Sequence, residues 1–141
     1  MTEDNTMLEM LELADLQESS LLDNGSYDLE IVAASQKDGV EWTDKDGVEH
    51  SASIINVTLV AAGEEDKHPV YHSMFKPNPD ENDPMEDVKR QRSIAGFLKK
   101  FDIAAKKAAY ADFIGKTANV RTYQKLDKDG ETRVNVKIPR F

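Results

Sequence analysis

Alternation of apolar and polar residues predicts three strands in the first half of the chain. In residues 26–34, apolar side chains fall on one face, and Asp28 and Glu30 fall on the other. A second alternating run covers residues 52–61 and a third covers residues 70–75. A glycine-containing acidic turn separates these two runs, so we expect them to be consecutive strands.

A helical period follows the proline-rich connection that ends at Pro84. Pro84 suits the first position of a helix, and Asp83 before it suits the N-cap. Apolar side chains then occur at i, i+3, i+4 and i+7, which is the spacing of one buried helix face. These residues are Ile94, Phe97, Leu98 and Phe101. We therefore expect a helix that starts at Pro84, and a second short helix within residues 103–112.

Two further strands are predicted at residues 118–125 and 133–138. Both alternate strictly, and the Asp-Lys-Asp-Gly turn at residues 127–130 joins them into a hairpin. The predicted order is three strands, a helix and two strands. This is the order of the five-stranded OB-fold barrel, in which the helix caps the barrel between strands three and four. We therefore expect a mainly β fold, a five-stranded OB-fold barrel, over residues 25–141.

Two segments fall outside this regular pattern. Residues 37–49 contain the sequence Lys-Asp-Gly-Val-Glu twice, and Trp42, the only tryptophan, lies between the copies. Two copies are too few for a repeat fold, so we expect a long loop or a small hairpin that turns at residues 44–47. Residues 1–24 form an acidic arm whose leucines and methionines allow a short amphipathic helix, although their spacing is imperfect.

Composition narrows the function classes. The chain has no cysteine, which excludes disulfides, thiolate metal sites and cysteine nucleophiles. No apolar run approaches the roughly 18 residues that span a bilayer, and no signal peptide is evident, so we expect a cytoplasmic protein without membrane contact. The net charge of −9 alone opposes nucleic acid binding. Its distribution is uneven, however, because residues 1–24 and 25–75 each carry −7 whereas residues 76–141 carry +5.

The cations of the last third gather on one face of the predicted final hairpin. We do not expect this face to be core, because the apolar residues of both strands point the other way. It carries Arg121, Tyr123, Lys125, Arg133, Asn135 and Lys137. Cations can follow the phosphates of a nucleic acid, and an aromatic ring can stack on a base without reading its identity. The alternative interpretation is an ordinary solvated hairpin face.

Three more aromatic residues are candidates for base stacking. Tyr71 and Phe75 share one face of the third strand, opposite His72 and Met74. If His72 and Met74 point into the barrel, the two rings are free to stack on bases; otherwise the rings belong to the core. Trp42 either contacts nucleic acid or folds back onto the barrel. The sequence leaves both choices open.

No other chemistry has a matching pattern. The Asp-Lys-Asp-Gly stretches lack the remaining ligands of a calcium loop, and the histidines lack zinc-site spacing on a strand. No phosphate loop, catalytic triad or paired-carboxylate signature is discernible, so we expect a binding protein without cofactor rather than an enzyme. The cations of the helical region are solvated helix faces or extra contacts to a nucleic acid backbone: Lys89, Arg90, Arg92, Lys99, Lys100, Lys106 and Lys107.

Several short motifs, in their shared order, resemble the small OB-fold single-stranded DNA-binding proteins encoded by bacteriophages. The likeness covers about residues 23–141. The motifs are GSYDLEI at residues 25–31, which resembles the family's glycine-x-tyrosine opening strand, the turn at residues 37–39, the helix end at residues 92–101, FIGKTANV at residues 113–120, and Asp129-Gly130 followed by residues 135–137.

The resemblance implies a protein that coats and protects single-stranded DNA, with little sequence preference, during phage DNA replication, recombination or repair in the host cell cytoplasm. Many members end in an acidic C-terminal tail that recruits replication enzymes, whereas this sequence ends in the basic stretch at residues 138–141 and has its acidic arm at residues 1–24. We hypothesise that this arm recruits replication or recombination enzymes, or competes with DNA for the basic face. The alternative function is an OB-fold protein-interaction module that recruits such enzymes through the arm. Homo-oligomer formation is left open.

Overall fold

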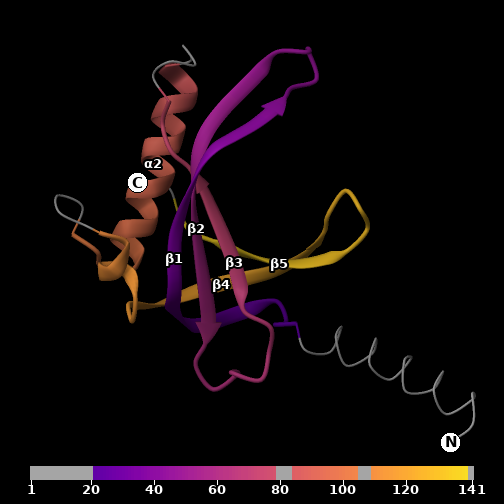
Figure 1. Cartoon of the computed structure of the whole chain (residues 1–141). Coiled ribbons are helices and arrows are strands. Elements are labelled where there is room, and N and C mark those ends of the chain that lie inside the picture. Colours follow the sequence, from indigo (N-terminus) through magenta and orange to yellow (C-terminus); the bar gives the residue numbers. More distant parts are fainter. Residues whose placement is uncertain (1–20, 79–83, 105–108, 140–141) are drawn as a thin grey trace, which may run out of the picture.

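Five strands and one α-helix make up the computed structural model of the chain, which describes residues 21–78, 84–104 and 109–139 (Figure 1). The strands are β1 (Gly25–Thr43), β2 (Glu49–Ala61), β3 (Val70–Phe75), β4 (Thr117–Leu126) and β5 (Thr132–Lys137). They form one antiparallel sheet in the order β3-β2-β1-β4-β5. The predicted sequence of three strands, a helix and two strands is confirmed.

The first two strands are longer than the sequence pattern predicts. Pairing continues through residues 37–49, where Trp42 lies opposite His50 close to the end of a hairpin. The small hairpin and its turn are therefore confirmed, and the predicted end of the first strand at residue 34 is wrong. The full length of β1 cannot be recognised from alternation alone, because the register of β1 shifts twice, after Ile31 and after Lys37. Such β-bulges bend the strand and interrupt its simple alternation.

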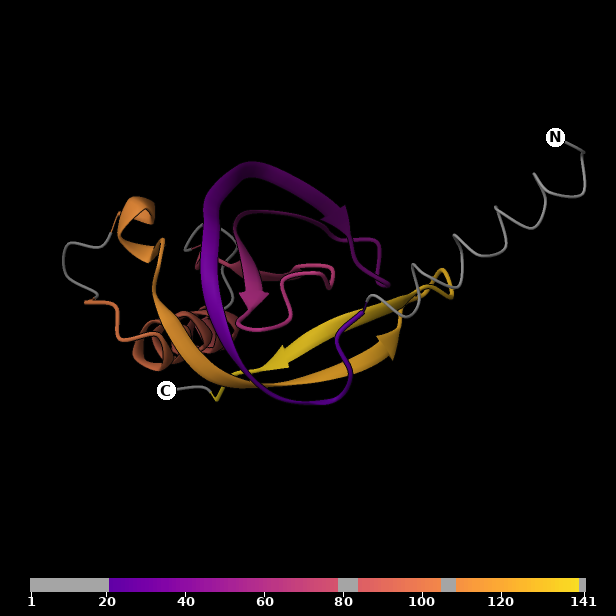
Figure 2. The same ribbon diagram turned by 90° about the horizontal axis from the view of Figure 1, so that it is seen from below.

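The sheet curls until its two edge strands approach each other, as Figure 2 shows from below. Residues of β3 and β5 come within 8 Å at Cα. In the described part of the chain, however, β3 and β5 are not hydrogen-bonded neighbours, so hydrogen bonds do not close the sheet into a barrel. The predicted mainly β architecture is confirmed in this coarser form.

The helix α2 (Pro84–Lys100) packs its last turns against the curled sheet. Phe97 is completely buried, and its ring centroid lies 4.8 Å from that of Phe101. Phe97 also contacts Phe113 of the short 3-10 helix η3 (Tyr110–Phe113), with 5.9 Å between the centroids. The predicted apolar helix face thus joins the core formed by the inward side chains of the strands.

Several boundaries of the helical region can be compared with their prediction. Pro84 is the first residue of α2, as predicted. The predicted N-cap, Asp83, lies outside the described residues. A second helix is predicted at residues 103–112. Its residues 105–108 also lie outside the described part of the chain, and at its end the structure has only the 3-10 turn η3. Neither described helix is long and apolar enough to cross a membrane.

The chain packs on β4 before β1 begins. Leu22 is buried, and its carbonyl oxygen accepts a hydrogen bond from Nε2 of Gln124 at 2.9 Å. The side chain of Asn24 accepts a second one from the backbone N–H of Gln124 at 2.7 Å. The last residues of the predicted acidic arm therefore belong to the sheet structure, and residues 1–20 lie outside the described part.

Candidate nucleic-acid interface

The outer face of the β4–β5 hairpin carries the predicted row of cations. The register pairs Arg121 with Lys137, Tyr123 with Asn135 and Lys125 with Arg133. Directly paired residues share one face of a sheet, so these six side chains project from the same side. We call this set the cationic face. The opposite side is core, because it holds the buried side chains of Val120, Thr122 and Val136.

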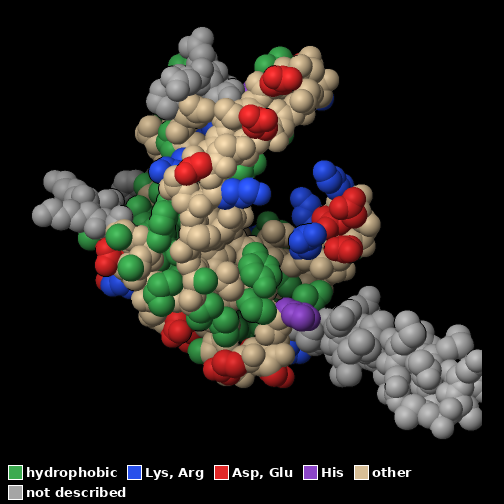
Figure 3. Space-filling model, viewed as in Figure 1, with side chains coloured by type: hydrophobic (Ala, Val, Ile, Leu, Met, Phe, Trp, Pro, Cys, Tyr) green, Lys and Arg blue, Asp and Glu red, His purple; other side chains and the backbone are tan. Residues whose placement is uncertain are grey.

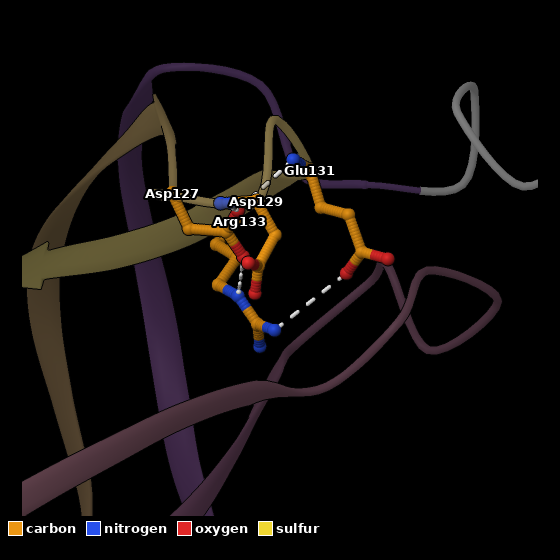
Figure 4. A network of polar contacts seen from close by, with 4 residues as sticks. All are labelled: Asp127, Asp129, Glu131 and Arg133. Carbon is orange, nitrogen blue, oxygen red and sulfur yellow. Dashed lines mark hydrogen bonds and ion pairs between the residues drawn. The ribbon is translucent and has the colours of Figure 1, made fainter.

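Arg133 differs from the other cations of this face because two acids hold it. Its Nε lies 2.6 Å from Oδ2 of Asp127, and its Nη2 lies 3.6 Å from Oε2 of Glu131 (Figure 4). The hydrogen bond from Arg133 lowers the pKa of the Asp127 carboxyl, and the same bond raises the pKa of the guanidinium. Arg133 therefore stabilises the hairpin turn, and the two carboxylates offset its positive charge, so it attracts a phosphate less than the sequence predicts.

The remaining cations of the cationic face are not neutralised in this way. Arg121, Lys125 and Lys137 are exposed, and none of them forms an ion pair with another residue of the described ranges. Nζ of Lys137 lies 5.6 Å from the centroid of the Tyr123 ring, within the range of a cation–π contact. The face thus offers three unpaired charges around a half-buried aromatic ring.

The structure decides which side of β3 faces the core. Val70 and Met74 are buried, whereas Tyr71 is 69% exposed and Phe75 is 41% exposed. His72 lies on the inner side, where its ring stacks on Phe97 with 5.8 Å between the centroids. Burial lowers the pKa of His72, because the protonated ring would lose its hydration. The two aromatic rings of β3 therefore point outward, which is the arrangement that base stacking requires.

Trp42 lies in an aromatic cluster rather than in an isolated loop. Its ring stacks on His50 with 5.4 Å between the centroids and is tilted against Phe75 at 5.2 Å. The guanidinium carbon of Arg90, on α2, lies 5.2 Å from the Phe75 centroid and 6.0 Å from that of Trp42. We call these four residues the tryptophan cluster. It joins two predicted stacking residues, Trp42 and Phe75, and adds a cation.

Sequence reasoning missed Arg90 and His50. The sequence places Arg90 either on a solvated helix face or in contact with a nucleic acid backbone, but its side chain is only 12% exposed and lies against the rings of Trp42 and Phe75. Its Nη1 donates to the carbonyl oxygen of Lys76, and its Nε, 3.9 Å from the Glu86 carboxylate, has no hydrogen-bond partner among the described residues. The signal that could have found His50 is the hairpin register, since it lies directly opposite Trp42.

A surface hollow of about 390 Å³ opens beside the tryptophan cluster, at the end of the β1–β2 hairpin. Its walls are Glu41, Trp42, Thr43, Glu49, His50 and Ser51. Two carboxylates in the wall disfavour a phosphate group, while the rings and hydroxyls suit a flat, uncharged group with polar edges.

The tips of the β1–β2 and β4–β5 hairpins are built alike. Oδ1 of Asp44 accepts the N–H groups two and four residues later at 2.8 and 3.0 Å, and Oδ1 of Asp127 does the same at 2.9 and 3.0 Å. The second carboxylate oxygen contacts the residue six positions on, at 2.7 Å for His50 and 2.6 Å for Arg133. The turns lock both hairpins, and they place Lys45 and Lys128 at equivalent positions of the tips.

The two hairpins border an open notch in the space-filling view (Figure 3). Lys and Arg side chains are visible at both of its borders, and apolar side chains lie below it on the sheet. Because β3 and β5 approach each other, the outward rings of β3 and the cationic face lie on neighbouring strands. The predicted site residues thus form two groups, the tryptophan cluster with Tyr71 and the cationic face.

The described ranges contain no candidate metal site. Within them, no three His, Asp or Glu side chains gather as a metal ion would require. No protein-family model matches the chain, and no curated protein is significantly similar to it. The geometry of the outer surface therefore carries the functional argument by itself.

Proposed function

We propose that this protein binds single-stranded DNA with little sequence preference across the outer faces of β3, β4 and β5. One observation carries the proposal. Tyr71 and Phe75 project outward from β3 with 69% and 41% of their surface exposed, and β3 approaches β5, which together with its partner β4 carries the unpaired cations. Exposed rings in a soluble domain cost free energy in water, so their position beside cations indicates a ligand with flat bases and phosphates.

The topology supports the part of this surface that lies on β3 and at the tips of the two hairpins. The strand order, the helix between β3 and β4, and the approach of β3 to β5 are those of an OB-fold barrel in which β3 and β5 would be the closing pair. OB-folds bind oligonucleotides on the face of strands two and three and with the loops that follow strands one and four. Here these loops are the tips of the two locked hairpins on either side of the notch.

In this proposal the cationic side chains contact phosphates and the aromatic side chains stack on bases. Arg121, Lys125 and Lys137 contact phosphates, since no acid neutralises them in the described structure. Tyr123, Tyr71 and the rings of the tryptophan cluster stack on bases. The hollow beside Trp42 accepts a base edge rather than a phosphate, because Glu41 and Glu49 form part of its wall.

The resemblance to phage single-stranded DNA-binding proteins suggests the biological setting. In this proposal the protein coats and protects exposed strands during phage DNA replication, recombination or repair, in the cytoplasm of the host. The net charge of −9 does not oppose this, because the local field of the cationic face, rather than the total charge, acts on a bound strand.

A salt-dependent titration with oligo-dT tests the proposal. Trp42 is the only tryptophan, so its fluorescence reports directly on the tryptophan cluster. With three unpaired cations on phosphates, the logarithm of the binding constant should fall against the logarithm of salt concentration with a slope of about −2. A duplex of the same length should bind more weakly. A flat salt response without any change in Trp42 fluorescence would rule the proposal out.

A matched pair of variants separates the cationic face from general charge. Replacing Arg121, Lys125 and Lys137 by alanine should remove most of the salt dependence. Replacing Lys89, Lys100 and Lys116 by alanine, three exposed lysines outside the cationic face, should leave it unchanged. Equal effects of both sets would mean that binding follows net charge and not this surface.

A further inference from the structure

An apolar groove runs along α2, on a different part of the surface from the proposed DNA site. Its volume is about 510 Å³, and its lining is mostly hydrophobic. The lining residues are Pro77, Gln91, Ile94, Ala95, Leu98, Lys99 and Ile103. Two exposed apolar residues, Met85 and Val88, lie nearer the start of the helix at 74% and 50% exposure, and Arg92 separates them from Ala95 on the same row of the helix.

Ile94 and Leu98 pack against the core on one side and border the groove on the other, so the groove lies at the edge of the buried helix face. A solvated helix face normally carries polar residues, and an apolar groove with a polar rim is the common recognition site for an amphipathic segment. Lys99 lines the groove, and Lys100 follows it in the last turn of α2, so this end of the groove carries basic residues. The groove therefore suits an apolar segment that is rich in acids.

The chain itself contains such a segment at residues 7–16. It holds Met7, Leu8, Met10, Leu11, Leu13 and Leu16, and no basic residue occurs anywhere in residues 1–20. Acids recur at intervals of three residues along it and just beyond it, at Glu9, Glu12, Asp15 and Glu18. Both the apolar side chains and the charge complement the groove and its rim.

Geometry decides whether the segment could come from the same copy. The described part of the chain, which starts at residue 21, begins on the side of the molecule away from α2 in both ribbon views (Figures 1 and 2). Five residue steps separate Leu16 from Leu21, so they can lie at most about 18 Å apart. A compact domain of this size is about 35 Å across. A reach of about 18 Å across a domain of about 35 Å favours the groove of a second copy over that of the same copy.

We propose that residues 7–16 of one copy bind in the α2 groove of a second copy. Where the exchange is not reciprocal, the contact is head to tail, and one end copy keeps a free segment while the other keeps a free groove. Copies can therefore add in a row, and the proposed DNA surface stays uncovered along the row. The inference rests on the groove and the segment and does not depend on DNA binding.

Two variants of the full chain remove the two halves of the contact. Gln91→Glu with Ala95→Glu adds two acids to the groove wall at partly or fully exposed helix positions. Leu8→Ser with Leu11→Ser removes apolar side chains from the segment. We expect the wild type to gain mass with concentration in sedimentation velocity, and each variant to associate at least about tenfold more weakly. Val48→Asp, an exposed apolar position at the hairpin tip, should associate like the wild type.

Mixing the two variants gives the decisive result. A groove variant still has its segment and a segment variant still has its groove, so a 1:1 mixture should form a heterodimer and nothing larger. A wild type that stays monomeric at all concentrations would overturn the proposal. So would a mixture of two folded variants, checked by thermal melting, that fails to form the heterodimer. Binding of a short oligo-dT by each variant should be unchanged, which keeps this test separate from that of the DNA site.

Discussion

Removing the Tyr71 ring provides the most direct test of base stacking on β3. The substitution Tyr71→Ala deletes the most exposed aromatic ring that the structure places on this face, at 69% exposure. Each stacked base contributes on the order of 1–3 kcal/mol by alanine substitution. We therefore expect the affinity for oligo-dT to fall by a factor between about 5 and 150.

The same exposure limits the effect on stability. A fully enclosed aromatic side chain buries about 150–250 Å², so the shielded third of Tyr71 corresponds to about 60 Å². At about 25 cal/mol per Å² this stabilises the fold by about 1.5 kcal/mol at most. The variant should thus remain folded under conditions where its DNA affinity is measured.

Fluorescence titration at fixed salt, combined with thermal melting, separates the two effects. Val70→Ala is the matched control, because Val70 is the preceding residue on β3 and is 1% exposed. It should lower stability by about 2 kcal/mol and leave the affinity of the folded protein unchanged. Tyr71→Phe, which keeps the ring, should bind like the wild type. If Tyr71→Ala binds oligo-dT as tightly as the wild type, the β3 face does not stack on bases.

Three further outcomes follow from the charges and ionisable groups. Arg121→Ala or Lys137→Ala should each reduce the salt slope by about 0.7, whereas Arg133→Ala should change it less and lower the melting temperature, because Asp127 and Glu131 already hold that side chain. Burial lowers the pKa of His72, so the histidine of the unfolded chain takes up a proton at a higher pH than that of the folded protein. As the pH drops below about 6.5, the melting temperature of the wild type should therefore fall relative to that of His72→Leu. The hydrogen bond from Arg133 lowers the pKa of Asp127 below its ordinary value of 3.8, so the ionised carboxylate stabilises the fold above pH 3.8 and this stabilisation is lost as the pH falls through the lower folded pKa. In thermal melts at neutral pH, Asp127→Ala should destabilise the protein more than Asp127→Asn, because the asparagine oxygen can still accept the hydrogen bonds of the turn.

Much of the fold follows from local pattern. β3, β4 and β5, the turn between the last two strands and the start of α2 lie within a residue or two of their prediction, because period and turn residues act locally. The extension of β1 does not follow from pattern. Its outer half is held by pairing with β2 across two register shifts, and a shift moves the following side chains to the other face.

The candidate site divides in the same way. The cationic face could be predicted because its residues alternate along two strands joined by one short turn. The choice between the two sides of β3 could not, since either Tyr71 and Phe75 or His72 and Met74 could fill the core by size and polarity. Contact with Phe97 of α2 decides it, and no local pattern reveals that contact.

Arg133 shows why a count of charges on a face overstates what a ligand meets. By alternation it belongs with Lys125, its partner across the hairpin. The turn places Asp127 six residues before it, and the carboxylate that caps two N–H groups also reaches its guanidinium. The equivalent carboxylate in the other hairpin, Asp44, contacts His50, which stacks on Trp42. The same turn motif thus has two different effects. At one tip its aspartate pairs with a cation of the cationic face, and at the other it holds the histidine that stacks on Trp42. The two tips therefore present different groups to a bound DNA strand despite their common sequence.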